Sequence, residues 1–209
     1  MEEPDIEYNT YSQAYSDAHT KENTDLEYHG YLNLDKVLNA QKPLSEEPLE
    51  IMFIVAHQSS ELWFKVLIQE LTRYPSPAPN YDPTIQLDRI AKILEHLNTI
   101  WTVLATMTPE EYDRFRFKLG KASGLQSKQY KKVKTLLQEL PTRWNRKYKH
   151  FLINIENSFK KYQFSHMKTA ERIIGNKDGT GGTSGVEYLK KAINTPLFIE
   201  PRDYEWKGW

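Results

Sequence analysis

Apolar residues recur at intervals of three and four along most of the chain, which is the spacing of one face of an α-helix. We expect helices over residues 45–74, 85–104 and 142–174, and shorter helical segments at 32–38, 108–120, 129–140 and 186–192. No segment shows the alternation typical of a half-buried strand, and neither an internal repeat nor a coiled-coil heptad is found. The pattern predicts an all-α fold, most simply an antiparallel helix bundle.

Capping and breaking residues mark the ends of several predicted helices. Ser45, followed by two glutamates, is suited to begin the first long helix. Thr108 and Glu111 have the spacing of a capping box, in which each side chain bonds to the other residue's backbone amide. Pro141 is expected to end the helix before it, and Gly175 to end the last long helix.

Composition and charge exclude several classes of protein. The 209 residues contain 28 Lys and Arg against 28 Asp and Glu, so no net positive charge is available to bind nucleic acid. The absence of cysteine excludes disulfides, thiolate metal sites and a cysteine nucleophile. No apolar run approaches the length of a membrane span and the acidic N-terminus lacks a signal core, so we expect a soluble, cytoplasmic protein.

Two regions differ in composition from the rest. Residues 1–26 are polar and acidic, and we expect an N-terminal arm that is either disordered or docked on a neighbouring surface. Residues 27–209 are expected to form a single helical domain, and this length is ample for a sizeable hydrophobic core. The basic run KQYKKVK, residues 128–134, is predicted to be a solvated helix face.

Two histidines stand out because they lie on apolar faces of different long helices. Phe53, His57 and Glu61 are spaced to share one face, and His166 follows Tyr162 on another such face. The plain interpretation of each is a core histidine whose ring nitrogens are satisfied by neighbours. Helix bundles, however, build cofactor sites from inward-facing side chains of facing helices, so the pair also indicates a site.

Haem is the cofactor that such a histidine supports most simply. His57 and Glu61 have a chelating spacing, but the third and fourth ligands of a zinc site cannot be named. Haem needs one axial histidine and an apolar slot. Arg116 lies between Phe115 and Phe117, and it either packs its stem at the rim of the core or directs its guanidinium at a carboxylate.

The glycine-rich segment GTGGTSG, residues 179–185, does not match a nucleotide-binding loop. It lacks the GK[ST] ending and the GxGxxG spacing, and no strand precedes it. It is either a flexible connector or a backbone that closes over a ligand, with the hydroxyls of Thr180, Thr183 and Ser184 available.

Four ordered blocks of the sequence resemble the defining segments of the tryptophan 2,3-dioxygenase family. They are YLNLDKVLNAQKPLS, IMFIVAHQSSELWFKVLIQEL, the segment from EYDRFR through ASG to QSKQY, and SHMKTAERIIGNKDGTGGTSGVEYL. Together these blocks cover about half of the chain. The resemblance implies an all-α haem enzyme, usually a homotetramer, that opens the indole ring of L-tryptophan with O2 to give N-formylkynurenine.

Carried over by position, the resemblance also implies roles for single residues. His166 would be the axial ligand of haem b, ferrous in its active form, and Trp101 a distal-side residue of the cofactor pocket. His57 would be the distal histidine that hydrogen-bonds the indole nitrogen. The implied substrate contacts are Phe53, Tyr112, Phe115, Arg116, Ser123, Thr180, Tyr28, Tyr31 and Leu32. Tyr28, Tyr31 and Leu32 belong to an N-terminal segment that would line the pocket of its own subunit or of a neighbouring one. A homo-oligomer, either dimer or tetramer, is therefore expected.

The chain departs from the family pattern in its middle region. Only about 35 residues separate QSKQY from His166, where the family has several more helices, so a shortened bundle is expected. Ser165 stands where an arginine is common. One alternative is a haem-dependent monooxygenase acting on a tryptophan derivative or another aromatic amino acid. The others are a haem- or ligand-binding protein without turnover, and a helical interaction module without haem.

Overall fold

The structure, a computed structural model, describes residues 27–73, 82–143, 146–175, 177 and 185–198. The chain divides into two compact units, Met1–Gln41 and Lys42–Trp209. The described helices of the first unit are α2 (Tyr28–Leu32) and α3 (Leu34–Leu38), joined by Asn33 at a φ of 51°. Asparagine is among the residues that best tolerate this left-handed conformation. The predicted arm of residues 1–26 lies outside the described residues.

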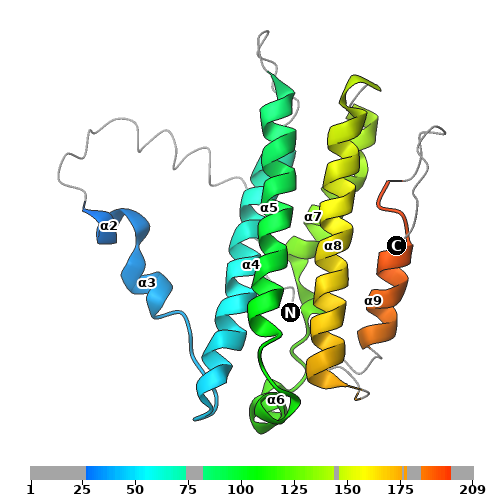
Figure 1. Cartoon of the computed structure of the whole chain (residues 1–209). Coiled ribbons are helices and arrows are strands. Elements are labelled where there is room, and N and C mark those ends of the chain that lie inside the picture. Colours follow the sequence, from blue (N-terminus) through cyan, green and yellow to red (C-terminus); the bar gives the residue numbers. More distant parts are fainter. Residues whose placement is uncertain (1–26, 74–81, 144–145, 176, 178–184, 199–209) are drawn as a thin grey trace, which may run out of the picture. The chain divides into compact units, whose positions relative to one another are not determined.

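The second unit is a bundle of helices, and its described part contains no strand. The helices are α4 (Pro48–Thr72), α5 (Pro83–Leu104), α6 (Pro109–Arg116), α7 (Lys128–Arg143), α8 (Lys149–Ile174) and α9 (Gly185–Asn194). Short 3-10 turns cover Phe117–Leu119, Gly124–Gln126 and Arg146–Tyr148. The prediction of an all-α bundle is confirmed (Figure 1).

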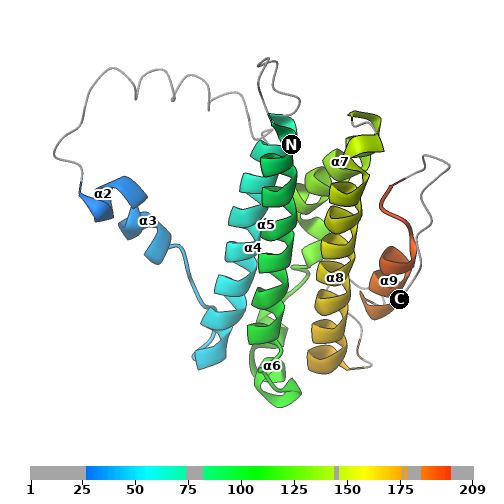
Figure 2. The same ribbon diagram turned by 45° about the horizontal axis from the view of Figure 1, so that its top comes forward.

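Four helix pairs make the most extensive contacts in the described part of this bundle. Helix α4 packs against α5 and α7, while α8 packs against α5 and α9, and α4, α5 and α8 run side by side in both views (Figures 1 and 2). The predicted apolar faces supply the core between them. Its fully buried aliphatic residues recur at helical spacing and include Leu67, Leu71, Leu87, Ile90, Leu94, Leu97, Leu137 and Leu140.

Two of the predicted helix ends are confirmed in detail. The Thr108 amide donates to the Glu111 carboxylate at 2.8 Å, and the Glu111 amide donates to the Thr108 hydroxyl at 3.2 Å. This is the capping box that the sequence predicts for α6. Gly175 ends α8 with a φ of 65°, a conformation that glycine adopts without a steric penalty.

Three predicted boundaries are wrong. Ser45 precedes α4 without capping it, because its backbone and hydroxyl both donate to the buried carboxylate of Glu50. Helix α7 continues through Pro141 to Arg143, since a proline in the final turn removes only one backbone hydrogen bond. Helix α8 begins at Lys149, later than predicted, because a 3-10 turn separates it from α7.

One face of α4 is apolar and exposed in the second unit. Its side chains Ile51, Val55, Leu62 and Val66 are 48%, 46%, 56% and 36% exposed. Within the described residues α4 is the one helix long and apolar enough to span a membrane by length and composition, so the prediction that no such run exists was wrong. Its other face carries His57 and Glu61 into a cavity, which is the arrangement of a bundle helix with a site on its inner side.

Candidate active site

A cavity of about 460 Å³ lies among α4, α5, α7 and α8. The segment between α6 and α7 and Leu189 of α9 complete its lining. Its volume falls within the range of about 300–1,000 Å³ that ligand and cofactor pockets occupy. Apolar atoms form most of its surface, but about half of the lining side chains are polar, so the cavity is suited to bind a ligand that combines a large apolar part with polar groups.

His57 presents a hydrogen-bond acceptor to this cavity. Its Nδ1 atom lies 2.8 Å from the Phe53 carbonyl oxygen, one helical turn earlier. A carbonyl oxygen only accepts hydrogen bonds, so Nδ1 carries the proton and Nε2 keeps its lone pair. Burial lowers the pKa of His57, although the Phe53 bond and the charge of Glu61 oppose this effect. The ring is therefore neutral at pH 7, with Nε2 as an acceptor.

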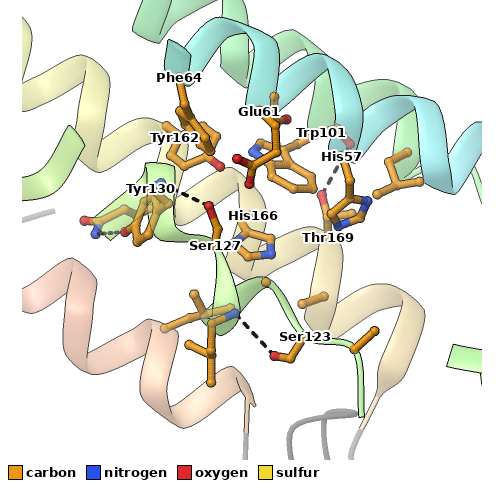
Figure 3. Close-up of a pocket in the computed structure, with 18 of the residues that line it drawn as sticks. His57, Glu61, Phe64, Trp101, Ser123, Ser127, Tyr130, Tyr162, His166 and Thr169 are labelled. Carbon is orange, nitrogen blue, oxygen red and sulfur yellow. Dashed lines mark hydrogen bonds between the residues drawn. The ribbon is translucent and has the colours of Figure 1, made fainter. Parts of the chain in front are cut away.

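His166 lines the same cavity from α8. Its ring stacks on the Trp101 indole, with centroids 4.4 Å apart and planes 18° from parallel (Figure 3). Among the described residues its ring nitrogens have no hydrogen-bond partner. Burial, followed by the nearby His57, lowers the pKa of His166 to about 4. A neutral imidazole is the form that ligates a metal.

Trp101 connects the two histidines. The His57 ring contacts the indole edge-on at a centroid distance of 5.8 Å. The same indole stacks on the His166 ring. The Thr169 hydroxyl on α8 donates to the Trp101 carbonyl oxygen at 3.3 Å. Ser165 donates to the Asn98 side-chain oxygen at 3.2 Å, which adds a second bond between α8 and α5 beside His166. The position of His166 is thus fixed from two sides.

Aromatic side chains surround the space near the histidines. Phe53 lies 5.7 Å from both Tyr112 and Phe115 between ring centroids, and Phe64 lies 5.9 Å from Tyr162. Burial raises the pKa of the Tyr162 hydroxyl well above its usual value, so this group stays neutral. These rings line an apolar slot between α4 and α8.

Among the described residues, Glu61 is the one carboxylate in the lining of the cavity. The Gln129 side-chain amide on α7 donates to both the Glu61 backbone oxygen at 3.0 Å and its carboxylate at 2.8 Å. Figure 3 shows the Glu61 carboxylate directed into the space between Tyr162, Trp101 and His57. This bond fixes α7 against α4 and places a negative charge near His57.

Comparison with known proteins identifies the family. The family model described as tryptophan 2,3-dioxygenase matches residues 12–152 and 149–202. The chain belongs to the tryptophan 2,3-dioxygenase family. Similar proteins named tryptophan 2,3-dioxygenase include that of Bradyrhizobium diazoefficiens, 33% identical over 91% of this chain and 95% of the relative. That of Pseudomonas aeruginosa is 33% identical over 84% of this chain and 87% of the relative. That of Bordetella parapertussis is 34% identical over 84% of this chain and 89% of the relative.

The comparison also locates the missing residues. The alignment with the Bradyrhizobium tryptophan 2,3-dioxygenase spans 266 residues, which is more than the 209 of this chain, so the relative contains residues without a counterpart here. The two matched parts of the family model meet at residues 149–152, in the first turn of α8. The shortened middle region predicted from the sequence therefore falls at this helix start.

The structure brings together most of the residues to which the tryptophan 2,3-dioxygenase pattern assigns a role. The cavity is lined by Phe53, His57, Trp101, Tyr112, Ser123 and His166. Phe115 is fully buried behind Phe53. Tyr28, Tyr31 and Leu32 belong to the first unit, where all three are exposed. Thr180 lies outside the described residues.

Arg116 is placed differently from the expectation of a pocket-lining clamp. It lines a separate depression with Asp113, Phe117 and Gly120. Its guanidinium interacts with the Tyr112 hydroxyl and opposes the rise in the pKa of Tyr112 that burial causes. Since Tyr112 does line the cavity, Arg116 acts on the site through this hydroxyl in the described arrangement.

Sequence reasoning also missed one whole wall of the cavity. The run KQYKKVK is not a fully solvated helix face, because Tyr130, Lys131 and Lys134 all line the cavity. Gln163 lines it as well, and its amide donates to the Tyr130 hydroxyl at 2.9 Å. Gln163 lies three residues before His166, and this spacing could have indicated that both share one helix face.

Proposed function

We propose that the protein is a haem-dependent dioxygenase that opens the indole ring of L-tryptophan with O2. The observation that carries this proposal is the pair of neutral histidines on one aromatic cavity, in a chain of the tryptophan 2,3-dioxygenase family. His166 offers a lone pair to a metal, and His57 offers a hydrogen-bond acceptor to a substrate.

The residues present fit haem b. Among the described residues no three His, Asp or Glu side chains gather as a metal-ion site, whereas a cofactor that brings its own ring of ligands requires only His166. His166 would hold the iron, and Trp101 would keep the imidazole in orientation. When bound in its ferrous form, haem supplies the O2 activation that the reaction of an aromatic ring with O2 requires.

His57 would orient the indole. Its Nε2 atom can accept a hydrogen bond from the indole N–H, since Nδ1 is occupied by the Phe53 carbonyl. Phe53, packed on His57 with centroids 4.3 Å apart, would contact the face of the indole. One hydrogen bond and one aromatic wall are sufficient to fix both the position and the plane of a flat substrate.

The amino-acid end of the substrate would lie toward α6 and the turn that follows it. Tyr112 and Ser123 line this part of the cavity, and Arg116 interacts with the Tyr112 hydroxyl. A shift of Arg116 toward the cavity would let its guanidinium pair with the substrate carboxylate. Thr180 is the proposed contact of the glycine-rich segment.

Isotopic oxygen tests the proposal. The full chain is loaded with haem, reduced, and given L-tryptophan with labelled O2, and the product mass is measured. Two labelled oxygen atoms in the product are expected. His57→Ala should lower the rate, while His96→Ala, which changes an exposed histidine outside the cavity, should not. The absence of any product from a protein that binds haem would refute the proposal and favour a binding protein.

One observation favours a second candidate function. The chain lacks residues that its relatives have at the start of α8, and their absence would leave this end of the bundle less covered. A less enclosed site could insert one oxygen atom into a tryptophan derivative or another aromatic amino acid. The labelling experiment separates the two functions, because a monooxygenase product carries one labelled atom.

The exposed stripe of α4, consisting of Ile51, Val55, Leu62 and Val66, supports a homo-oligomer. An apolar stripe of this length on a soluble protein is typical of a subunit interface. Replacing Val55 and Leu62 together by glutamate should lower the molar mass measured by light scattering. The control is Thr99→Glu, an exposed change on α5 that should leave the mass unchanged.

A further inference from the structure

The cavity has a cationic wall that the reaction at the histidines does not use. Lys131 and Lys134 both line it from α7, with Lys131 exposed and Lys134 half-buried. Residues three apart on a helix share a face, so the two ammonium groups flank the same region. Neither lysine forms an ion pair with another described residue. Two cations without a carboxylate partner in the described part of the chain indicate an anionic ligand.

The other charged residues around the cavity leave Lys131 and Lys134 as its unpaired cations among the described residues. Lys177 lines the cavity but is paired with Asp113. The positive charge of Lys134 lies close enough to the buried Lys160 to lower the pKa of Lys160. Glu61 is the one acid that the described part of the chain contributes to the lining, and its carboxylate already accepts from Gln129. A ligand carboxylate is therefore repelled near Glu61 and attracted near Lys131 and Lys134.

Gln163 supplies a second and independent sign of an absent ligand. Its side chain is 2% exposed, and its Oε1 atom has no hydrogen-bond partner, although its Nε2 atom donates to the Tyr130 hydroxyl. Turning the amide by a half-turn would let the Tyr130 hydroxyl donate to Oε1. The amide NH2 would then be free to donate to a carboxylate oxygen in the cavity. A bound carboxylate thus removes the unsatisfied buried atom.

We propose that Lys131 and Lys134, with the Gln163 amide, bind the two propionate groups of haem. This inference rests on the proposed function, since it takes haem as the ligand of His166. Haem combines a large apolar ring with two neighbouring carboxylates, and the cavity combines an aromatic slot with two neighbouring lysines. L-Tryptophan has one carboxylate, which leaves the second lysine without a partner.

Haemin and its dimethyl ester provide a direct test, because the ester retains the iron and the ring but has no carboxylate. Each is titrated into the haem-free full chain at low salt, and the dissociation constant is measured from the Soret band. The wild type should bind haemin more tightly than the ester. The double variant Lys131→Gln/Lys134→Gln should lose about 5- to 30-fold in affinity for haemin and keep its affinity for the ester.

Lys132→Gln is the matched control, since this exposed lysine of α7 does not line the cavity. It should bind both compounds as the wild type does. High salt should reduce the preference of the wild type for haemin, because Lys131 is exposed and its charge is screened. Circular dichroism confirms that each variant retains its helix content.

The outcomes separate the two proposals. If the wild type binds haemin and the ester equally well, or the double variant keeps the wild-type preference, the propionate assignment is wrong and the proposed function is unaffected. If neither compound produces a Soret complex, the proposed function fails and this inference falls with it.

Discussion

Lys160 offers the sharpest test of how the second unit holds its C-terminal helix. This lysine of α8 is 1% exposed, and its ammonium donates to the carbonyl oxygens of Ala192 at 3.0 Å and of Thr195. These carbonyls lie at the end of α9, where no further helical turn follows to satisfy them. Lys160→Met keeps most of the apolar stem and removes the ammonium. We expect α9 to be fastened less firmly to α8.

The expected loss of stability follows from the two carbonyl groups. Each acceptor left without its donor costs about 1–3 kcal/mol if it stays buried. Water can reach part of this site, because Thr195 is exposed, and the substitution also removes the cost of burying a cation. Both effects reduce the loss, so we expect the free energy of unfolding to fall by about 2 kcal/mol at pH 7.

Urea unfolding followed by circular dichroism measures this change. The matched control is Lys161→Met, which alters an exposed lysine on the same helix and should change stability by less than about 0.5 kcal/mol. Hydrogen exchange should show the added opening in α9 in particular, since Leu197 also donates to the buried Glu156 at 2.8 Å. An effect of Lys160→Met no larger than that of the control would refute the reasoning.

The same lysine gives a pH dependence. Burial lowers the pKa of Lys160 from 10.5 to about 8, with a further lowering by Lys134 and an opposing effect of Glu156. Between these values the unfolded chain binds the proton and the folded chain does not, so this group makes stability rise with pH. The difference in stability between the wild type and Lys160→Met should therefore widen from about pH 8 to pH 10.5.

Three further predictions concern the site and the entry to α4. His166→Ala should abolish the Soret complex with haem, because no other histidine lines the same wall of the cavity on α8. His57→Ala should lower kcat/KM for L-tryptophan about 10- to 100-fold, and the effect should vanish for a substrate methylated at the indole nitrogen. The Glu50 carboxylate accepts hydrogen bonds from the Leu44 and Ser45 amides. Burial raises the pKa of Glu50, but these bonds outweigh burial and lower the pKa below 4.5. The stability that the ionised carboxylate contributes should therefore disappear in acid. Urea unfolding of Glu50→Gln against the wild type measures that contribution, and an unchanged difference at low pH would contradict it.

The main helices and the histidine pair could be predicted from the sequence because they depend on local patterns. The apolar periodicity of α4 and α5 and the capping box at Thr108 are readable from neighbouring residues. His57 and His166 stand out because each interrupts an apolar face. Their contact with one indole, by contrast, depends on how α4, α5 and α8 pack, which no local pattern contains.

The lysine wall could not be predicted for a related physical reason. Lys131 and Lys134 belong to a run whose composition is that of a solvated face, and their stems reach the cavity only because α7 packs on α4. The break between α7 and α8 is predicted a few residues too early, at Pro141, because this proline lies in the final turn of α7 and the helix continues to Arg143. Long-range packing decides both cases.

The place where the chain is shorter than its relatives bears on which reaction it catalyses. The two parts matched by the family model meet at residues 149–152, and at 1.5 Å per residue His166 lies about 25 Å further along α8. Trp101 stacks on His166 and His57 contacts Trp101, so all three lie at the same level of the bundle, away from that junction. The junction therefore lies away from the two histidines on which the proposed ring opening depends, and this is the reason that ring opening ranks ahead of monooxygenation.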